Sequence, residues 1–96
     1  MKINYWEILY FEGMGDSIKI VVENQSFTTT QNFRSLEKQL PPYFFLRVHK
    51  SYIVSLNKVD SIHKNNVIIK DKMIPVSDTY KKKFIARFKE GRILLK

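Results

Sequence analysis

Four side chains capable of hydrogen bonding or proton transfer interrupt an apolar segment that reads FFLRVHKSYIVSL over residues 44–56. They are Arg47, His49, Lys50 and Ser51. Cations and short donors of this kind bind phosphate oxygens, and the same side chains can reach base edges in a groove. A histidine beside a cation can instead act as a general acid or base. The segment therefore indicates either recognition of a nucleic acid or acid–base catalysis.

Catalysis would need a second group that converges on His49, and the sequence supplies few candidates. His63 lies fourteen residues later, in a segment expected near a turn, so nothing in the spacing brings the two imidazoles together. The sequence contains neither a phosphate-binding G-x-x-x-x-G-K loop nor a G-x-S-x-G nucleophile motif. We therefore predict that the protein is not an enzyme and uses no cofactor or metal. A basic module that binds RNA or acts like a ribonuclease is the alternative left open.

The positive charge of the chain is concentrated in its C-terminal half. Residues 45–96 carry thirteen Lys and Arg against four Asp and Glu, a net charge of +9. Residues 1–44 carry four against five, a net charge of −1. Such asymmetry favours a polyanionic partner, which could be DNA, RNA or an anionic membrane surface. Added lysine for solubility is the plainer explanation of the charge.

Composition narrows the possibilities further. The chain of 96 residues is long enough for one domain, residues 1–96, with a modest core. It has no cysteine and only two histidines, which argues against disulfides and a structural zinc site. No apolar run is long enough to span a bilayer, and the N-terminus lacks the apolar stretch of a secretory signal. We therefore expect a soluble, cytoplasmic protein without a membrane partner.

Most of the chain has the alternation and β-branched content of strands. Turn signals separate the strands, chiefly EGMGD at residues 12–16 and ENQ at residues 23–25. The first three strands should form an antiparallel meander, and the strands on either side of KDK should form a hairpin. The expected strands are residues 8–11, 18–22, 27–30, 44–48, 52–56, 67–69 and 73–76, with a weaker one near residues 59–62.

The first expected helix follows the meander. Its apolar residues Phe33, Leu36 and Leu40 share one helical face. Thr30 or Asn32 can cap its start, and the two prolines after Leu40 end it.

A second helix is expected near the C-terminus. Ser77 or Asp78 can cap its start, and Gly91 should end it. Its apolar positions are Tyr80, Phe84, Ile85 and Phe88, and its solvated face carries Lys81, Lys82 and Lys83. The apolar tail RILLK that follows should pack against the domain.

This arrangement excludes two common kinds of nucleic-acid reader. The two expected helices are separated by about forty residues of strand-like sequence, so no helix-turn-helix is present. Most aromatics alternate with aliphatic residues, as core residues do, so no stacking platform for single strands is evident. A break in the strand near His49 would present Lys50 and Ser51 at a bend. Two possibilities remain. One is a β-rich domain that recognises double-stranded DNA with its loops, and the other is a module that binds a membrane surface through its amphipathic C-terminal helix, whose pattern partly fits that role.

The ordered motif FLRVHKSYIVSL, with VDSI at residues 59–62 and IPVS at residues 74–77, closely resembles the LytTR DNA-binding domain. The upstream ILYFEG at residues 8–13 resembles the first well-marked strand of that family. The resemblance covers about residues 7–88 and is more specific than any short motif considered above.

The resemblance implies a mainly β, elongated fold of small antiparallel sheets with one or two short helices. It also implies bacterial transcription regulation, as the output domain of a two-component response regulator. Loops of the family enter successive major grooves of double-stranded DNA, and two copies usually occupy paired direct repeats, which implies a homodimer on DNA. A receiver domain, absent from this sequence, is the other implied partner.

The resemblance further indicates which residues contact DNA. Lys50 and Ser51, after the motif histidine, correspond to the central contact. Asp16 and Ser17 correspond to the loop after the first strand, and Asp78 follows the IPVS segment. The full predicted set is Lys50, Ser51, Arg47, His49, Asp16, Ser17, Ser77, Asp78, Thr79 and Lys82, with Arg47 and Lys82 expected to support phosphate binding.

Several of these residues have a second interpretation. Phosphate repels the carboxylates of Asp16 and Asp78, where the family often has basic or amide residues, although a carboxylate can accept from a cytosine amino group. Asp78 is favoured as a helix N-cap, and Asp16 is equally a plain turn residue. His49 is favoured as a structural residue hydrogen-bonded to backbone at the bend. Trp6 is expected in the core or covering an edge, and Arg47 could simply be solvated.

Overall fold

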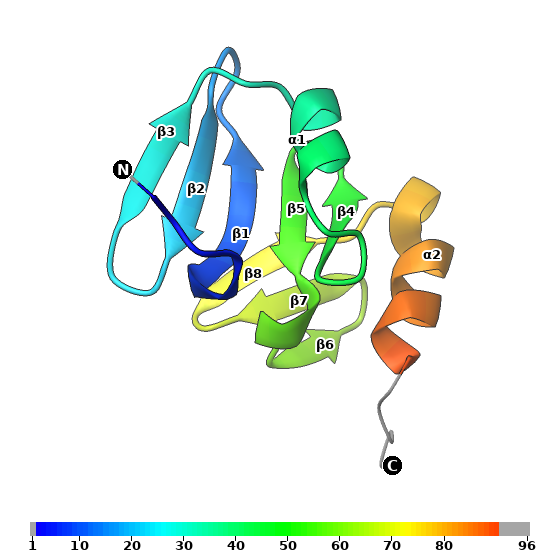
Figure 1. The fold of residues 1–96 in the computed structure, drawn as a ribbon. Helices are drawn as coiled ribbons and strands as arrows, with labels where there is room; N and C mark the ends of the chain where they lie inside the picture. Colours follow the sequence, from blue (N-terminus) through cyan, green and yellow to red (C-terminus); the bar gives the residue numbers. More distant parts are fainter. Residues whose placement is uncertain (1, 91–96) are drawn as a thin grey trace.

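The computed structural model describes residues 2–90 of the chain, which form two antiparallel sheets and two α-helices (Figure 1). A short 3-10 helix, η1 (Tyr5–Glu7), precedes the first strand, and a second one, η2 (Leu56–Lys58), follows the fifth. The strands are β1 (Ile8–Gly13), β2 (Ile18–Val22), β3 (Ser26–Thr29), β4 (Phe45–His49), β5 (Tyr52–Ser55), β6 (Ser61–His63), β7 (Asn66–Ile69) and β8 (Lys72–Pro75). The α-helices are α1 (Phe33–Gln39) and α2 (Asp78–Lys89). The mainly β, elongated fold predicted from the sequence is confirmed, with overall dimensions of 41 × 26 × 24 Å.

The larger sheet has five strands in the order β3-β2-β1-β5-β4, with every neighbouring pair antiparallel. The predicted meander is therefore present as β1, β2 and β3. Its first strand also pairs with β5, which lies some forty positions later in the sequence, as the pairing of Glu12 with Tyr52 shows. This long-range pairing places β1 in the middle of the sheet, and Ile8, Leu9, Tyr10 and Phe11 are all buried.

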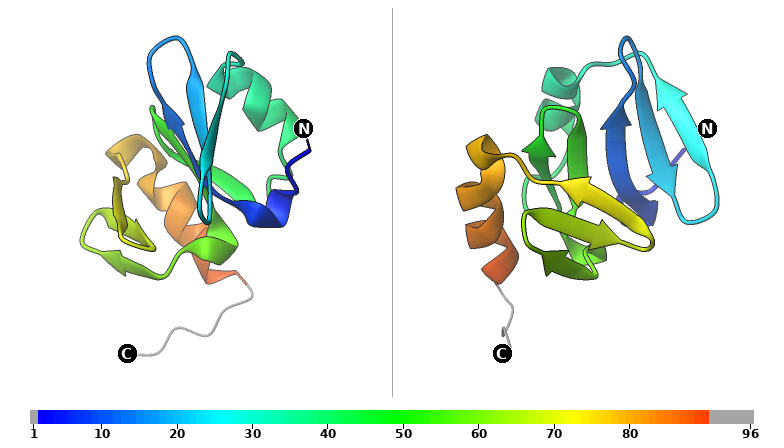
Figure 2. Two further views of the ribbon diagram at one scale, coloured as in Figure 1. Left: turned by 90° about the vertical axis from the view of Figure 1, so that its left-hand side faces the viewer. Right: turned by 180° about the vertical axis from the view of Figure 1, so that it is seen from behind.

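Both faces of the larger sheet are covered, which explains why β1 is apolar on both sides. On one face, α1 packs its buried Leu36 against Phe11 and Ile53. On the other face, the second sheet and α2 pack against β4 and β5, with Val48, Val54 and Phe84 in one cluster. The side view on the left of Figure 2 shows α1 on the opposite side of the larger sheet from β6, β7 and β8.

The first helix begins and ends as its sequence predicts. Of the two possible caps, Asn32 is the N-cap, because its side-chain Oδ1 accepts a hydrogen bond of 2.8 Å from the Ser35 N–H. Leu36 and Leu40 are buried, and Leu40 is the C-cap directly before the two prolines. The helix is short because proline disfavours helical geometry in the residue before it.

The second sheet, in the order β6-β7-β8, contains the expected hairpin of β7 and β8. After β8, the N-cap of α2 is Ser77, and Asp78 is the first helical residue. Of the two caps predicted from the sequence, Ser77 is therefore correct, and the interpretation of Asp78 as the N-cap is wrong. Ser77 makes no side-chain cap hydrogen bond, and its N–H instead donates to the carbonyl of Val48 in β4 at 2.9 Å. A tertiary contact thus sets the start of this helix, and the Asp78 carboxylate is favourably placed near the positive end of the helix dipole.

Trp6 is 71 % exposed, so the expectation that it lies in the core or covers an edge is wrong. It stands on η1, where the chain has not yet joined the sheet. The expected helix end at Gly91 and the packing of the apolar tail fall outside the described residues. Within residues 2–90, no helix combines the length and the apolar character needed to cross a membrane.

Candidate nucleic-acid interface

Three chain segments meet at one end of the larger sheet, namely residues 13–17, 49–51 and 77–79, which are called the loop edge below. The Gly13 N–H, at the end of β1, donates to the carbonyl of Ser51 at 2.8 Å. The Ser77 N–H donates to the carbonyl of Val48, two residues before the β4–β5 turn, at 2.9 Å. The β4–β5 turn therefore lies between the β1–β2 loop and the start of α2, at the upper end of the view in Figure 1.

The β4–β5 turn presents Lys50 to solvent. The strand register shifts between Arg47 and His49, and His49 pairs with Tyr52, so that Lys50 and Ser51 form the turn. The His49 Nδ1 accepts a hydrogen bond of 3.1 Å from the Ser51 N–H. The bend predicted near His49, and the hydrogen bond of this histidine to backbone, are both confirmed. Lys50 is exposed and Ser51 is half-buried.

Arg47 fixes the shape of this turn from inside. Its Nη2 donates to the carbonyl of Lys50 at 2.6 Å, and its Nε donates to the carbonyl of His49 at 3.3 Å. Its Nη1 donates to the Glu37 Oε2 on α1 at 3.3 Å, in an ion pair. The planar guanidinium therefore holds two consecutive carbonyls of the turn and one carboxylate, a task that suits its fixed fork of donors.

Two aromatic rings complete the surroundings of Arg47. The guanidinium carbon lies 4.8 Å from the centroid of Phe33, on α1, and 5.8 Å from that of Tyr80, on α2. Both separations lie within the range of attraction between a cation and a ring face. One side chain of β4 thus links the turn to both helices.

Phe33 also restricts which residue can occupy the last position of β1. A Cβ atom added to Gly13 would lie 3.0 Å from the Phe33 Cε2 and 3.6 Å from the Ser51 Cα. A side chain at this position would therefore have to displace the Phe33 ring, so the close approach of β1, α1 and the turn favours a glycine. Neither Phe33 nor Glu37 was identified from the sequence as part of the site. Helical spacing assigned Phe33 to the core, and nothing local relates Glu37 to Arg47, ten residues later.

A second polar group, next to the turn, is formed by side chains of β1, β2 and β5. The Tyr52 hydroxyl donates to the Glu12 Oε2 at 3.0 Å, and the Lys19 Nζ lies 3.4 Å from the Glu12 Oε1. The Glu12 Oε1 atom is buried and makes no hydrogen bond of good geometry with the described residues. The nearby charge of Lys19 therefore offsets the cost of burying this oxygen. Burial raises the pKa of Tyr52, and its hydrogen bond to Glu12 raises this pKa further. The His49 and Tyr52 rings meet edge to face, with centroids 5.8 Å apart, and so connect this group to the turn.

The flanking segments carry the remaining predicted residues. In the β1–β2 loop, the Met14 N–H donates to the carbonyl of Ser17 at 2.8 Å, Gly15 has a φ of +94°, and Asp16 is exposed. On α2, Asp78 and Thr79 are exposed and Ser77 is half-buried, and Lys82 lines the same open helix face as Asp78. The loop edge thus contains eight of the ten predicted residues. Of the other two, Arg47 holds the turn from behind, and Lys82 lies one helical turn beyond Asp78 on α2.

The two histidines considered for catalysis lie in different sheets, His49 in β4 and His63 in β6. His63 is exposed. Among residues 2–90, no group of three or more His, Asp and Glu side chains is arranged to hold a metal ion.

Comparison with known proteins places this geometry in context. The family model of the LytTr DNA-binding domain matches residues 1–89. Sensory transduction protein LytT of Bacillus cereus is 30 % identical over 86 residues, which cover 83 % of this chain and 35 % of that protein. The LytT protein of Bacillus subtilis is 32 % identical over 82 residues, covering 79 % of this chain and 34 % of that protein. The chain therefore spans about a third of the length of the curated relatives it matches.

A solved structure of a LytTr DNA-binding domain from Bacillus cereus superposes with a TM-score of 0.85. The match covers 93 % of this chain and 87 % of that one, at 21 % sequence identity. At this level of identity the likeness establishes the shared fold.

Proposed function

The chain belongs to the LytTR DNA-binding domain family, and from this premise we propose that it binds specific sequences of double-stranded DNA with its loop edge against the duplex. DNA binding in transcription regulation follows from the family itself. The use of the loop edge, the assignment of contacts and the groove geometry are the parts proposed here.

The observation that carries this assignment is the position of Lys50. It is exposed at the tip of a turn whose backbone is held by Arg47, and it lies between the two flanking segments of the loop edge. A cation on a rigid protrusion can enter a groove without the entropic cost of ordering a mobile loop. Ser51, which is half-buried beside it, adds a short hydroxyl donor for a phosphate or base edge.

Arg47 is better suited to positioning than to contact with phosphate. Its Nε, Nη1 and Nη2 each already donate to a protein oxygen. Moving the guanidinium to DNA would leave the carbonyls of His49 and Lys50 without these donors and separate the ion pair with Glu37. Lys82, which is exposed on α2, is a more accessible candidate for phosphate contact.

The acidic residues have a different proposed role. Asp16 and Asp78 stand on the two flanks of Lys50, one in the β1–β2 loop and the other in the first turn of α2. They would repel phosphates on either side and so weaken non-specific binding, while accepting from a cytosine amino group at a matching site. Ser17, Ser77 and Thr79 supply neutral donors in the same segments.

At the level of the whole protein, we propose a bacterial response regulator of a two-component system that acts in the cytoplasm. The domain would bind DNA as two copies on paired direct repeats, under the control of a receiver domain in the same regulator. The relatives named LytT are described as sensory transduction proteins, which supports this assignment.

Selection of bound duplexes from a random pool tests the proposal directly. We expect enrichment of a pair of short repeats, and with a Lys50→Ala variant the enriched repeats should lose their base preference at one position. Recovery of unrelated sequences, with an affinity that depends only on salt, would show that binding is non-specific. The RNA alternative predicts cleavage of single-stranded RNA that is lost in His49→Ala, and such turnover would contradict the proposed function.

A further inference from the structure

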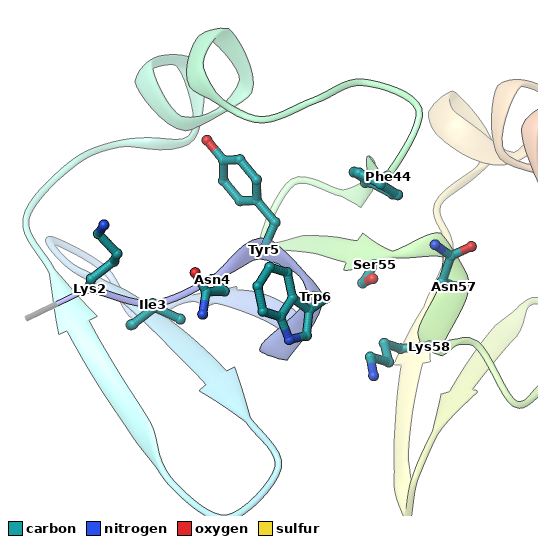
Figure 3. Close-up of a pocket in the computed structure, with 9 residues that line it drawn as sticks. All are labelled: Lys2, Ile3, Asn4, Tyr5, Trp6, Phe44, Ser55, Asn57 and Lys58. Atoms are coloured by element: carbon teal, nitrogen blue, oxygen red, sulfur yellow. The ribbon is translucent and has the colours of Figure 1, made fainter.

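A cavity of about 540 Å³ opens at the end of the larger sheet opposite to the loop edge (Figure 3). The strand directions establish this position. β1 ends at the loop edge with Gly13 and therefore begins at the far end, directly after η1. β5 begins at the loop edge with Tyr52 and ends at the far end with Ser55, which is followed by η2. The cavity lies between η1 and the start of η2, so it is separate from the candidate nucleic-acid interface.

One part of the cavity is apolar and aromatic. Ile3, Tyr5, Trp6 and Phe44 line it, and Trp6 and Tyr5 are 71 % and 44 % exposed. An indole ring left this open to water gains free energy when an apolar body covers it. The volume lies within the range of about 300–1,000 Å³ that is usual for sites of small organic ligands.

The other part of the cavity is polar, and its groups lack partners. Ser55 is only 5 % exposed and is the one buried polar residue in the part of the chain that is described. Its hydroxyl makes no hydrogen bond to any residue between 2 and 90, and Figure 3 shows it facing the cavity. The hydroxyl is accessible from the cavity, so it is available to hydrogen-bond to a ligand bound there.

Asn57 and Lys58 lie next to Ser55 at this same end of the cavity, away from Ile3 (Figure 3). Lys58 forms no ion pair with the described residues, and no Asp or Glu lines the cavity. The cavity therefore has a cationic end rich in donors and an aromatic end. Lys2 lies at the other end of the cavity, beside Ile3 (Figure 3).

We propose that this cavity binds a small amphiphile with a single anionic head group, of the medium-chain carboxylate type. The carboxylate is held by the Lys58 ammonium, the Ser55 hydroxyl and the Asn57 amide, and the apolar body lies against Tyr5, Trp6 and Phe44. This site is independent of DNA binding, because it shares no residue with the loop edge.

Charge complementarity favours this occupant over a second copy of the chain. Each copy carries a net charge of +8, so two copies meeting at Lys2 and Lys58 would bring like charges together. A small anion instead neutralises a lysine that has no acidic partner within residues 2–90. A charge-assisted hydrogen bond of this kind is among the stronger polar contacts in proteins.

The experiment uses Trp6, the only tryptophan of the chain, as a reporter inside the site. Tryptophan fluorescence is followed while decanoate, decanol or decyltrimethylammonium is added below its micellar concentration. We expect a saturable blue shift with decanoate, and binding about tenfold weaker for decanol, since loss of a charge-assisted hydrogen bond costs roughly this factor. Decyltrimethylammonium should not bind.

Variants then test the polar end. Lys58→Gln should weaken decanoate binding about tenfold, leave decanol binding unchanged, and be rescued in part by Lys58→Arg. Ser55→Ala should weaken decanoate severalfold. Lys64→Gln, which removes the same charge in the β6–β7 turn, is the matched control and should bind decanoate like the parent. Far-UV circular dichroism confirms that each variant is folded.

Three results would overturn the proposal. The first is equal binding of decanoate and decanol, and the second is the absence of any Trp6 response to all three probes. The third is a Trp6 spectrum that changes with protein concentration alone, together with a dimer in sedimentation, which would identify the cavity as an interface between copies. DNA binding by Lys58→Gln should equal that of the parent. The two proposals are therefore tested separately, and loss of the amphiphile site as a proposal would not affect the proposed DNA binding.

Discussion

The central β4–β5 turn and the neighbouring β1–β2 loop both belong to the loop edge, but they are held very differently. The turn is fixed by the two Arg47 donors, by the His49–Ser51 hydrogen bond and by the Gly13–Ser51 backbone bond. The β1–β2 loop has one closing backbone bond, from Met14 to Ser17, and a glycine at positive φ. A recognition surface can thus combine one preorganised protrusion with adaptable flanks. Rigid contacts give discrimination, and adaptable ones follow the backbone of the duplex.

Arg47→Ala should have the largest effect on the difference in rigidity between the turn and the loop. The substitution removes the donors of two turn carbonyls and leaves Glu37 without its cation, so the free energy of unfolding should fall by about 2–3 kcal/mol. DNA affinity should fall as well, with little change in its salt dependence, because no phosphate contact is lost. Arg47→Lys should recover only a small part of the lost stability and DNA affinity, since an ammonium cannot reproduce the planar fork of guanidinium donors. Urea denaturation and binding titrations over a salt series measure both effects.

A contrary outcome for Arg47 is easily recognised. If the variant unfolds at the same urea concentration as the parent while the slope of log affinity against log salt drops by about one, Arg47 contacts a phosphate. It would then not be a positioning residue.

Lys50→Ala tests the tip of the turn without touching its supports. Binding free energy should weaken by about 1–3 kcal/mol, and the base preference should relax at one position of the site. Stability should change by less than about 0.5 kcal/mol, because Lys50 is exposed. An equal loss on all duplexes would mean that Lys50 neutralises a phosphate and reads no base.

Gly13→Ala and Gly15→Ala each add one methyl group, the first next to the β4–β5 turn and the second in the β1–β2 loop, and so compare how tightly the two segments are packed. The added methyl group at Gly13 meets Phe33 at 3.0 Å and should destabilise the fold by about 1–2 kcal/mol. At Gly15 nothing lies within 4 Å, and only the positive φ opposes the change, at about 1 kcal/mol or less. DNA affinity should fall further for Gly13→Ala, because its displacement reaches the turn. Equal effects in thermal melts and binding titrations would show that the turn is no more constrained than the loop.

The acidic flanks should have a smaller effect. Asp16→Asn removes a carboxylate from an exposed loop and should tighten non-specific DNA binding about two- to threefold at low salt, fading as salt rises. Asp78→Asn should do the same, but should also lower stability by about 0.3–1 kcal/mol through the helix dipole. Competition with random-sequence duplex measures the ratio of specific to non-specific affinity. An unchanged ratio would contradict the proposal that Asp16 and Asp78 weaken non-specific binding.

The polar group next to the turn gives the smallest effect, as a dependence of stability on pH. Folding raises the pKa of Tyr52 above its ordinary value of 10.0, chiefly through burial. Its contribution to stability is therefore complete below pH 10 and is lost as the pH rises through the pKa of the folded state. Tyr52→Phe should flatten the fall in unfolding free energy above pH 10, leaving the part due to Tyr10, whose pKa burial also raises. An unchanged pH profile in denaturation would contradict this assignment.

Much of the fold was predictable because local sequence specifies it. The residues of β2 were predicted without error, and the hairpin of β7 and β8 within a residue or two. The helical face of Phe33, Leu36 and Leu40 was also recognised. Periodicity and turn signals act over a few residues, so they can be read in one chain segment at a time.

The errors occurred where distant segments meet. Asp78 was favoured as the N-cap on side-chain preference, but a backbone bond from Ser77 to Val48 sets the start of α2. Trp6 was expected in the core or covering an edge, but it is exposed on η1 and lines a cavity. Hydrophobicity alone did not place Trp6, and cap preference alone did not distinguish Ser77 from Asp78.

By itself the sequence determined the family, the strands and helices, and the bend that exposes Lys50, because a long ordered motif and local patterning are written in consecutive residues. Only the tertiary structure decided that β1 lies between β2 and β5, that Arg47 is held by Glu37, Phe33 and Tyr80, and that Ser55 faces an aromatic cavity. These arrangements depend on contacts between segments that lie as many as 44 residues apart, as in the pairing of Tyr10 with Val54. Their free energy comes from packing the whole core at once, so no single segment encodes them.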